Sequence, residues 1–168
     1  MIKIQESILT FSRAKMYEWA IFAVCISSIP LILHQQWITG PIVNAILVAA
    51  TFRLGAGKAL TLAILPSAAA LAAGTLPFVL APTLPVIILG NMLLIAGVHV
   101  LKTKPVFGVI LGAVVKFIWL IIASQWILQF FLSEKFLGNV AAMLSWPQLA
   151  TALLGGAIAL GILHIWKK

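Results

Sequence analysis

The chain has 168 residues, of which 63% are hydrophobic and 8% are charged, and its mean hydropathy is +1.18. This composition excludes a soluble globular protein and predicts an all-α, polytopic integral membrane protein that has lipid as its solvent. The formal net charge is +8, but the basic residues stand singly at the ends of apolar runs. That pattern indicates membrane topology, and no nucleic-acid partner is expected.

Residues 1–16 are expected to form a cytoplasmic segment ahead of a single transmembrane domain at residues 17–168. Within this segment Ile4, Ile8 and Phe11 recur at helical spacing. The spacing predicts a short helix on the inner membrane surface, with a disordered tail as the alternative.

Six apolar runs are long enough to cross the hydrocarbon core as helices, which takes about 17 to 25 residues. They are residues 17–33, 37–53, 57–76, 83–101, 106–132 and 147–166. Basic residues flank the two ends of the chain and every second connection: Lys3, Arg13, Lys15, Arg53, Lys58, Lys102, Lys104, Lys167 and Lys168. Because Lys and Arg concentrate on the cytoplasmic side, both termini are expected in the cytoplasm and the protein in the plasma membrane.

Two asparagines lie inside apolar spans, Asn44 in the second and Asn91 in the fourth, and both are expected in the outer half of the membrane. Pro66 in the third span frees backbone groups at a similar level, which a neighbouring group must satisfy. A buried asparagine either bonds a neighbouring helix or lines a cavity. Convergence of both asparagines with a buried cation would favour a binding cavity.

Lys116 is the most unusual residue, because it lies near the middle of the fifth span. At roughly 1.5 Å per helical residue it is about 15 Å from the start of that span, farther than its side chain could recover by snorkelling. A cation at this depth is expensive and indicates a functional site. A lysine that reaches back to the cytoplasmic headgroups is the alternative.

The helical side that carries Lys116 also carries Gly112, Trp119, Ala123 and Trp126. A cation, two aromatic faces and two small residues would suit an anionic, planar or partly aromatic small molecule. Lipid-facing tryptophans are the alternative interpretation.

The connection before the last span, residues 133–145, places its apolar side chains on one helical face, as in a lid over a site or in an outer-leaflet anchor. They are Phe136, Val140, Met143 and Leu144.

The last span opens with Ser145 and Gln148 at the spacing of a capping box and with Pro147 in its first turn. Gln148 therefore either caps the helix or contributes to a ligand site. Small residues four apart follow, which allows close helix packing. The pairs are Ala152 and Gly156, Gly155 and Ala159, and Ala157 and Gly161.

The sequence carries no complete enzyme signature. Residues 55–59 partly match a phosphate-binding loop but lack its leading glycine and its Ser/Thr. The three carboxylates, Glu6, Glu18 and Glu134, lie at or outside the membrane boundaries, so neither an acid–base pair nor an intramembrane proton relay is expected. We expect no enzyme activity, no cofactor and no metal site, and the last point disfavours a bare metal ion as the substrate.

Four short motifs lie across residues 17–166. They are Gly-Pro-x-Val-Asn at residues 40–44, Gly90-Asn91, Val115-Lys116-Phe117, and Ser145-Trp146-Pro147-Gln148-Leu149 followed by Thr151 and Gly155-Gly156. With six spans in a chain of this length, they resemble the substrate-binding (S) component of energy-coupling factor (ECF) transporters.

The resemblance implies capture of one small micronutrient from outside the cell, energised by a separate transmembrane coupling subunit and two ATPases. Family members dock on their partner through small residues of the first span. The corresponding residues here are Ala20, Ala23 and Ser27, which are spaced three and then four apart.

The family's pocket opens outward beneath the outer loops, which implies a site near Asn44, Asn91 and Trp37 with Lys116 at its floor or below it. The full set of expected substrate-binding residues is Asn44, Asn91, Lys116, Trp119, Trp126 and Gln148.

Two other interpretations stay open. The chain could be a structural or assembly subunit of a larger membrane complex, which would bind no ligand. It could also be a b-type cytochrome, since His99 and His164 lie at matching depth near the cytoplasmic ends of two spans.

Overall fold

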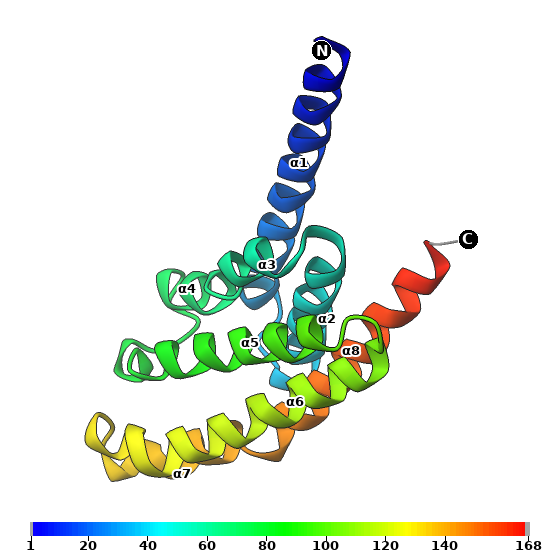
Figure 1. The fold of residues 1–168 in the computed structure, drawn as a ribbon. Coiled ribbons are helices and arrows are strands. Elements are labelled where there is room, and N and C mark those ends of the chain that lie inside the picture. The colour runs from blue at the N-terminus through cyan, green and yellow to red at the C-terminus, as the bar shows by residue number, and fades with distance from the viewer. Residues whose placement is uncertain (1, 167–168) are drawn as a thin grey trace.

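Figure 1 shows the computed structural model of the chain, which describes the backbone of residues 2–166 and the side chains of residues 13–166. The regular elements of this described part are all helices, which confirms the predicted all-α class. They are α1 (Ile2–Ile32), α2 (Gln36–Leu54), α3 (Ala56–Leu62), α4 (Leu65–Ala72), η1 (Phe78–Leu80), α5 (Thr83–Val100), α6 (Pro105–Ile122), η2 (Ala123–Ile127), η3 (Leu128–Phe130), α7 (Glu134–Met143) and α8 (Trp146–Ile165).

Within the described residues, five helical segments are long and apolar enough to cross a bilayer. They cover residues 13–32, 36–54, 83–100, 105–130 and 134–165. A further apolar segment, Ala56–Ala72, is shorter. These helices are compatible with a multi-pass membrane protein and overlap five of the six predicted spans.

The third predicted span, residues 57–76, is not one helix. The chain breaks between Leu62 and Leu65, because Pro66 has no backbone N–H and its ring clashes with the carbonyl four residues earlier. α4 then ends in a turn where Gly74 has a φ of 71°, a conformation that glycine adopts without steric cost. Proline and glycine together therefore shorten this apolar helical segment.

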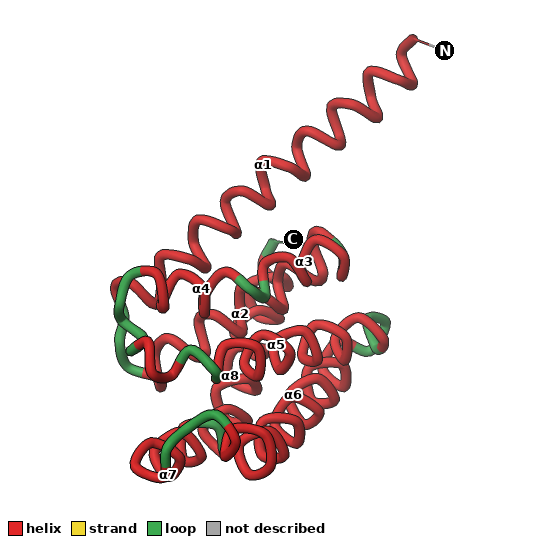
Figure 2. The backbone as a smooth tube through the Cα atoms, turned by 90° about the vertical axis from the view of Figure 1, so that its left-hand side faces the viewer, coloured by secondary structure: helices red, strands yellow, loops and turns green. Residues whose placement is uncertain are grey.

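α1 runs without interruption from Ile2, so the N-terminal segment continues directly into the first predicted span. The predicted surface face of Ile4, Ile8 and Phe11 lies outside the described side chains. Figure 2 shows the N-terminal half of α1 extending away from the other helices, while its C-terminal half packs beside α2, α3 and α4.

The fifth predicted span is helical but changes its helix type. After α6 the chain forms a π-helical turn, η2, and then the 3-10 turn η3. A π turn takes more residues than an α turn, so side chains beyond Ala123 rotate away from the stripe that α6 presents. This change of register decides where Trp126 points.

Glycines set the closest contacts between helices. A Cβ atom on Gly155 of α8 would lie 2.5 Å from the carbonyl oxygen of Pro41 in α2. A Cβ atom on Gly112 of α6 would lie 2.5 Å from the carbonyl oxygen of Leu94 in α5. No side chain fits at such distances, so these glycines allow α8 to pack on α2 and α6 to pack on α5. Of the small residues predicted on α8, four are buried and two are exposed: Ala152, Gly155, Gly156 and Ala159, against Ala157 and Gly161.

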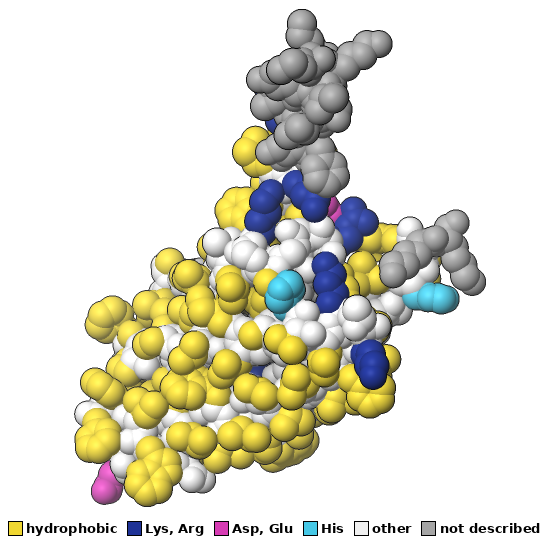
Figure 3. Space-filling model, in the orientation of Figure 1, with side chains coloured by type: hydrophobic (Ala, Val, Ile, Leu, Met, Phe, Trp, Pro, Cys, Tyr) yellow, Lys and Arg dark blue, Asp and Glu magenta, His cyan; other side chains and the backbone are white. Residues whose placement is uncertain are grey.

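Basic side chains gather toward one end of the molecule, which we call the basic end (Figure 3). Arg53, at the end of α2, forms an ion pair with Glu18 of α1 at 2.5 Å and lies 5.4 Å from the ring centroid of Trp166. Lys102 and Lys104 occupy the connection from α5 to α6. The starts of α2 and α8, together with α7, lie at the opposite end.

Candidate functional site: a buried lysine between two asparagines

The ammonium group of Lys116 is enclosed by polar groups from other helices. Its Nζ donates to Oδ1 of Asn44 in α2 at 2.8 Å and to Oδ1 of Asn91 in α5 at 2.9 Å. All three side chains are buried, with 2 to 3% of their surface exposed. The snorkelling interpretation of Lys116 is therefore wrong. The three polar residues that the sequence places at depth form one group, the Lys116 cluster.

Asn91 extends this cluster to the break in the third predicted span. Its Nδ2 donates to the carbonyl oxygen of Ala63 at 3.4 Å, in the gap between α3 and α4. Pro66 was expected to leave backbone groups that need a partner, and Asn91 supplies one, although the bond is long and therefore weak. The cluster thus connects α2, α5 and α6 with the break between α3 and α4.

The Lys116 cluster contains a basic side chain but no acidic one. Of the three carboxylates in the chain, Glu18 pairs with Arg53 and Glu134 is exposed on α7. The third, Glu6, lies outside the described side chains. A charge taken out of water without an opposite charge costs several kcal/mol, and neutral amide oxygens offset this only in part. An ammonium group has three donor hydrogens, and the two asparagines accept two bonds. The cluster can therefore accept an anionic group as a further partner.

The two tryptophans of the predicted site are separated by the π turn. Trp119 is half-buried, and its Nε1 donates to the carbonyl oxygen of Val86 in α5 at 2.9 Å. Trp126 is 67% exposed and points outward from the bundle. Only Trp119 remains on the side of Lys116, so the structure does not form the stacking wall of two aromatic rings that a regular helix predicts.

Gln148 is part of a junction at the opposite end from the basic end. Its Nε2 donates to the carbonyl oxygen of Met143 at 3.4 Å, and Nε2 of Gln36 donates to the same oxygen at 2.7 Å. The rings of Trp37 and Trp146 lie 5.1 Å apart with an interplanar angle of 51°. These contacts join the starts of α2 and α8 to the end of α7. The only sequence signal for this junction is a tryptophan near the start of α2 and another at the start of α8.

The predicted capping box at the start of α8 is wrong. The hydroxyl of Ser145 donates backward to the carbonyl oxygen of Ala142 at 2.7 Å and makes no cap bond. Pro147 does occupy the first turn, as expected. The hydroxyl of Ser145 therefore stabilises the turn from α7 into α8 and is not available to cap α8.

α7 packs on η2 and η3, which follow α6, with a face that differs from the predicted one. Val140 and Leu144 are buried against a cluster that contains Leu128 and Leu132, and Phe136 is half-buried. Met143, expected on the same face, is 47% exposed. The side chain of residue 143 points outward, while its carbonyl oxygen accepts both glutamine bonds.

The predicted docking residues of α1 are only partly accessible. Ala20 is exposed, whereas Ala23 and Ser27 are half-buried. Ala23 packs against the cluster around Ile26 and Leu62, so this face of α1 already contacts the rest of the bundle.

The two histidines of the haem interpretation do not share a cavity in the described structure. Both are exposed near the ends of their helices, and His164 lines a cavity whose lining does not include His99.

No protein-family model, curated protein or solved structure matches this chain.

Proposed function

We propose that this chain is the membrane-embedded binding subunit of an uptake system for a micronutrient. It captures a small anionic organic molecule, of the vitamin or vitamin-precursor kind, and separate coupling and ATPase subunits supply the energy. The four motifs that resemble ECF S components and the five membrane-length helices support this proposal.

In this proposal the chain crosses the plasma membrane six times. Ala56–Ala72 forms the short third crossing, and as a helix it would reach about 25 Å, close to the roughly 30 Å of the hydrocarbon core. The basic end then faces the cytoplasm, in line with the positive-inside rule. The junction at Met143 faces the outside.

The observation that carries the proposal is the charge balance of the Lys116 cluster. Lys116 bonds two neutral amides from two other helices and none of the described carboxylates. Asparagine side chains alone can form hydrogen bonds between membrane helices. A buried lysine is therefore not needed for helix packing. An anionic group on a ligand would supply the negative charge that the cluster lacks. Trp119 lies about one helical turn from Lys116 on α6 and would lie beside such a ligand.

The junction at Met143 offers a route by which a ligand reaches the cluster. Gln36, Gln148 and the Trp37–Trp146 pair hold α7 beside the starts of α2 and α8. These polar contacts are few and partly exposed, and the apolar packing of Val140 and Leu144 on Leu128 and Leu132 would have to open with them. Movement of α7 would admit the ligand from the outer side.

The test compares the wild type with Lys116→Met and Asn44→Asp. Lys116→Met removes the cation at nearly constant length, and Asn44→Asp places a carboxylate where the amide oxygen now bonds Nζ. Either change should reduce retention of an anionic ligand by at least about tenfold, since a hydrogen bond to a charged group contributes about 1.5–3 kcal/mol. The retained molecule is identified by native and denaturing mass spectrometry after purification in mild detergent.

Lys135→Met is the matched control, because it removes a lysine that is exposed on α7. It should retain the ligand like the wild type. A ligand that survives both Lys116→Met and Asn44→Asp would contradict the charge argument. A wild-type protein that retains no organic anion, and that no anionic vitamin stabilises against heating, would contradict the proposed function.

A structural or assembly subunit is the second candidate, and one observation favours it. No buried side-chain nitrogen or oxygen among the described residues lacks a hydrogen-bond partner, so the Lys116 cluster also serves as a contact between helices. This candidate predicts that the purified protein holds no small molecule and that Asn44→Asp strengthens the cluster without any loss of function.

A further inference from the structure

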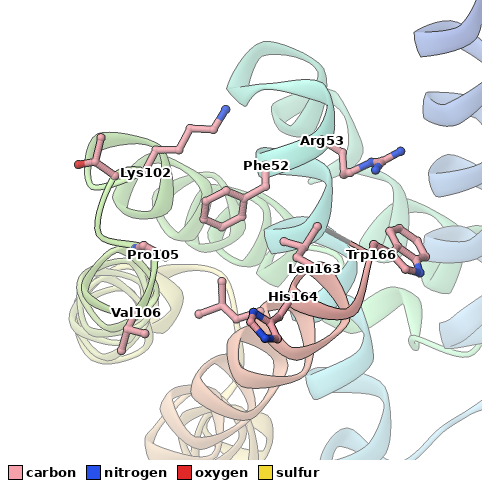
Figure 4. Close-up of a pocket in the computed structure, with 10 residues that line it drawn as sticks. Phe52, Arg53, Lys102, Pro105, Val106, Leu163, His164 and Trp166 are labelled. Atoms are coloured by element: carbon pink, nitrogen blue, oxygen red, sulfur yellow. The ribbon is translucent and has the colours of Figure 1, made fainter. Parts of the chain in front are cut away.

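A cavity of about 570 Å³ lies at the basic end, apart from the Lys116 cluster (Figure 4). It is enclosed by the end of α2, the connection from α5 to α6, and the end of α8. Its volume equals that of roughly twenty water molecules in the liquid, so it has room for more than a single small ion.

The described residues that line this cavity include basic side chains and no carboxylate. Lys102, from the connection between α5 and α6, and His164, from the end of α8, both line it (Figure 4). Arg53 also lines it, but its guanidinium points toward α1, where it pairs with Glu18. Lys102 and His164 are therefore the groups that are placed to donate to an anion.

The remaining walls are apolar and continue onto the outer surface of the bundle. Phe52 and Leu163 line the interior, and Val106, which is 57% exposed, forms part of the rim. Trp166, also at the rim, is 62% exposed and contacts Arg53. A tryptophan with basic neighbours at the end of a span is typical of the level of lipid headgroups.

We propose that this cavity binds the phosphate headgroup of an anionic phospholipid from the leaflet at the basic end. Lys102 and His164 donate to the phosphate oxygens, and the walls formed by Phe52, Leu163 and Val106 take the glycerol and the first part of the acyl chains. A lipid fits better than a soluble phosphate compound, because the apolar walls run out to the lipid-facing surface. This proposal does not depend on the proposed transport function.

The test uses native mass spectrometry of the full-length protein with phosphatidylglycerol or phosphatidylcholine added to the detergent. The wild type should retain one phosphatidylglycerol in preference to phosphatidylcholine. The Lys102→Ala/His164→Ala variant should retain at least about fivefold less, the change expected for removal of one cation near a membrane surface. A third measurement adds glycerol phosphate, which has the same headgroup chemistry without acyl chains.

The control variant is Lys104→Ala/His99→Ala, which loses the same residue types at the same end of the molecule but outside the cavity. It should retain phosphatidylglycerol like the wild type. Equal loss in both variants would overturn the proposal. A wild type without preference for phosphatidylglycerol would overturn it without reference to any variant. Binding of glycerol phosphate without binding of the lipid would reassign the cavity to a soluble ligand.

Discussion

Asn91 makes two hydrogen bonds where Asn44 makes one, and this difference predicts how their substitutions behave. Asn44→Leu leaves Lys116 bonded to Asn91. Asn91→Leu leaves it bonded to Asn44 but also removes the donor to the Ala63 carbonyl. A buried carbonyl without a partner costs about 1–3 kcal/mol, and the length of this bond favours the lower figure. Asn91→Leu should therefore be less stable than Asn44→Leu by about 1 kcal/mol.

Thermal unfolding of the two variants in the same detergent measures this difference, with the retention of helical circular dichroism as a check on folding. If the two variants unfold at the same temperature, the contact between Asn91 and Ala63 contributes nothing to stability.

At the residue scale, the burial of a polar residue among apolar helices is predictable from sequence, but the direction of a side chain is not. Counting residues along each span places Lys116, Asn44 and Asn91 in apolar surroundings, and the structure brings them together. The same counting places Trp126 beside Lys116 because it assumes a regular α-helix. The π turn breaks this assumption, and no residue type in the sequence announces such a turn. Sequence reasoning therefore predicts the polar groups of the cluster better than its aromatic wall.

At the scale of elements, the contact between α2 and α8 depends on the absence of side chains. Gly155→Val would place a Cβ atom 2.5 Å from the Pro41 carbonyl oxygen and 2.7 Å from the Cβ atom of Asn44. The helices would have to separate, which costs about 1–3 kcal/mol or more for overpacking of a tight interface. Because Asn44 lies in this contact, ligand retention should fall together with stability.

Gly161→Val is the matched control on the same helix, since nothing lies within 4 Å of a Cβ atom at that position. Thermal unfolding and ligand retention are measured for both variants. A fully stable Gly155→Val variant would contradict the close packing of α2 and α8.

Hydropathy predicts most helices of the bundle, and the third predicted span shows what hydropathy does not predict. An apolar run at residues 57–76 predicts one span, but Pro66 breaks the helix inside it and the turn at Gly74 ends it early. Proline in a membrane helix is compatible with either a kink or a break. The outcome depends on whether a neighbouring side chain bonds the backbone groups at the break. In this structure that neighbour is Asn91 of α5, which comes later in the chain and donates to the Ala63 carbonyl oxygen.

At the scale of the whole molecule, the separation of charge predicts its orientation in the membrane. The basic end carries Arg53, Lys102 and Lys104, while the opposite end has Lys135 beside Glu134. Since lysine and arginine are retained on the cytoplasmic side, the α5–α6 connection should face the cytoplasm and α7 the outside.

Labelling with a membrane-impermeant maleimide in intact cells tests this orientation. In a Cys25→Ala background, Gly138→Cys on α7 should react without permeabilisation, and Thr103→Cys should react only after the membrane is opened. The two positions are exposed in the structure, so a difference in reactivity reports the side of the membrane. The reverse labelling pattern would invert the topology and place the Met143 junction inside the cell.

The order of the Lys116 cluster along the chain has a consequence for biosynthesis. Both acceptors, Asn44 and Asn91, precede the lysine, so a ribosome delivers them to the membrane before α6 emerges. A lysine at the centre of an inserting helix costs about 2.5–3.5 kcal/mol when the helix meets lipid alone. Here α5 and α6 are joined by a short connection and can enter as a hairpin, with Asn91 already beside the ammonium group. The chain therefore inserts Lys116, the residue with the highest insertion cost, only after its two hydrogen-bond acceptors, Asn44 and Asn91, have been synthesised.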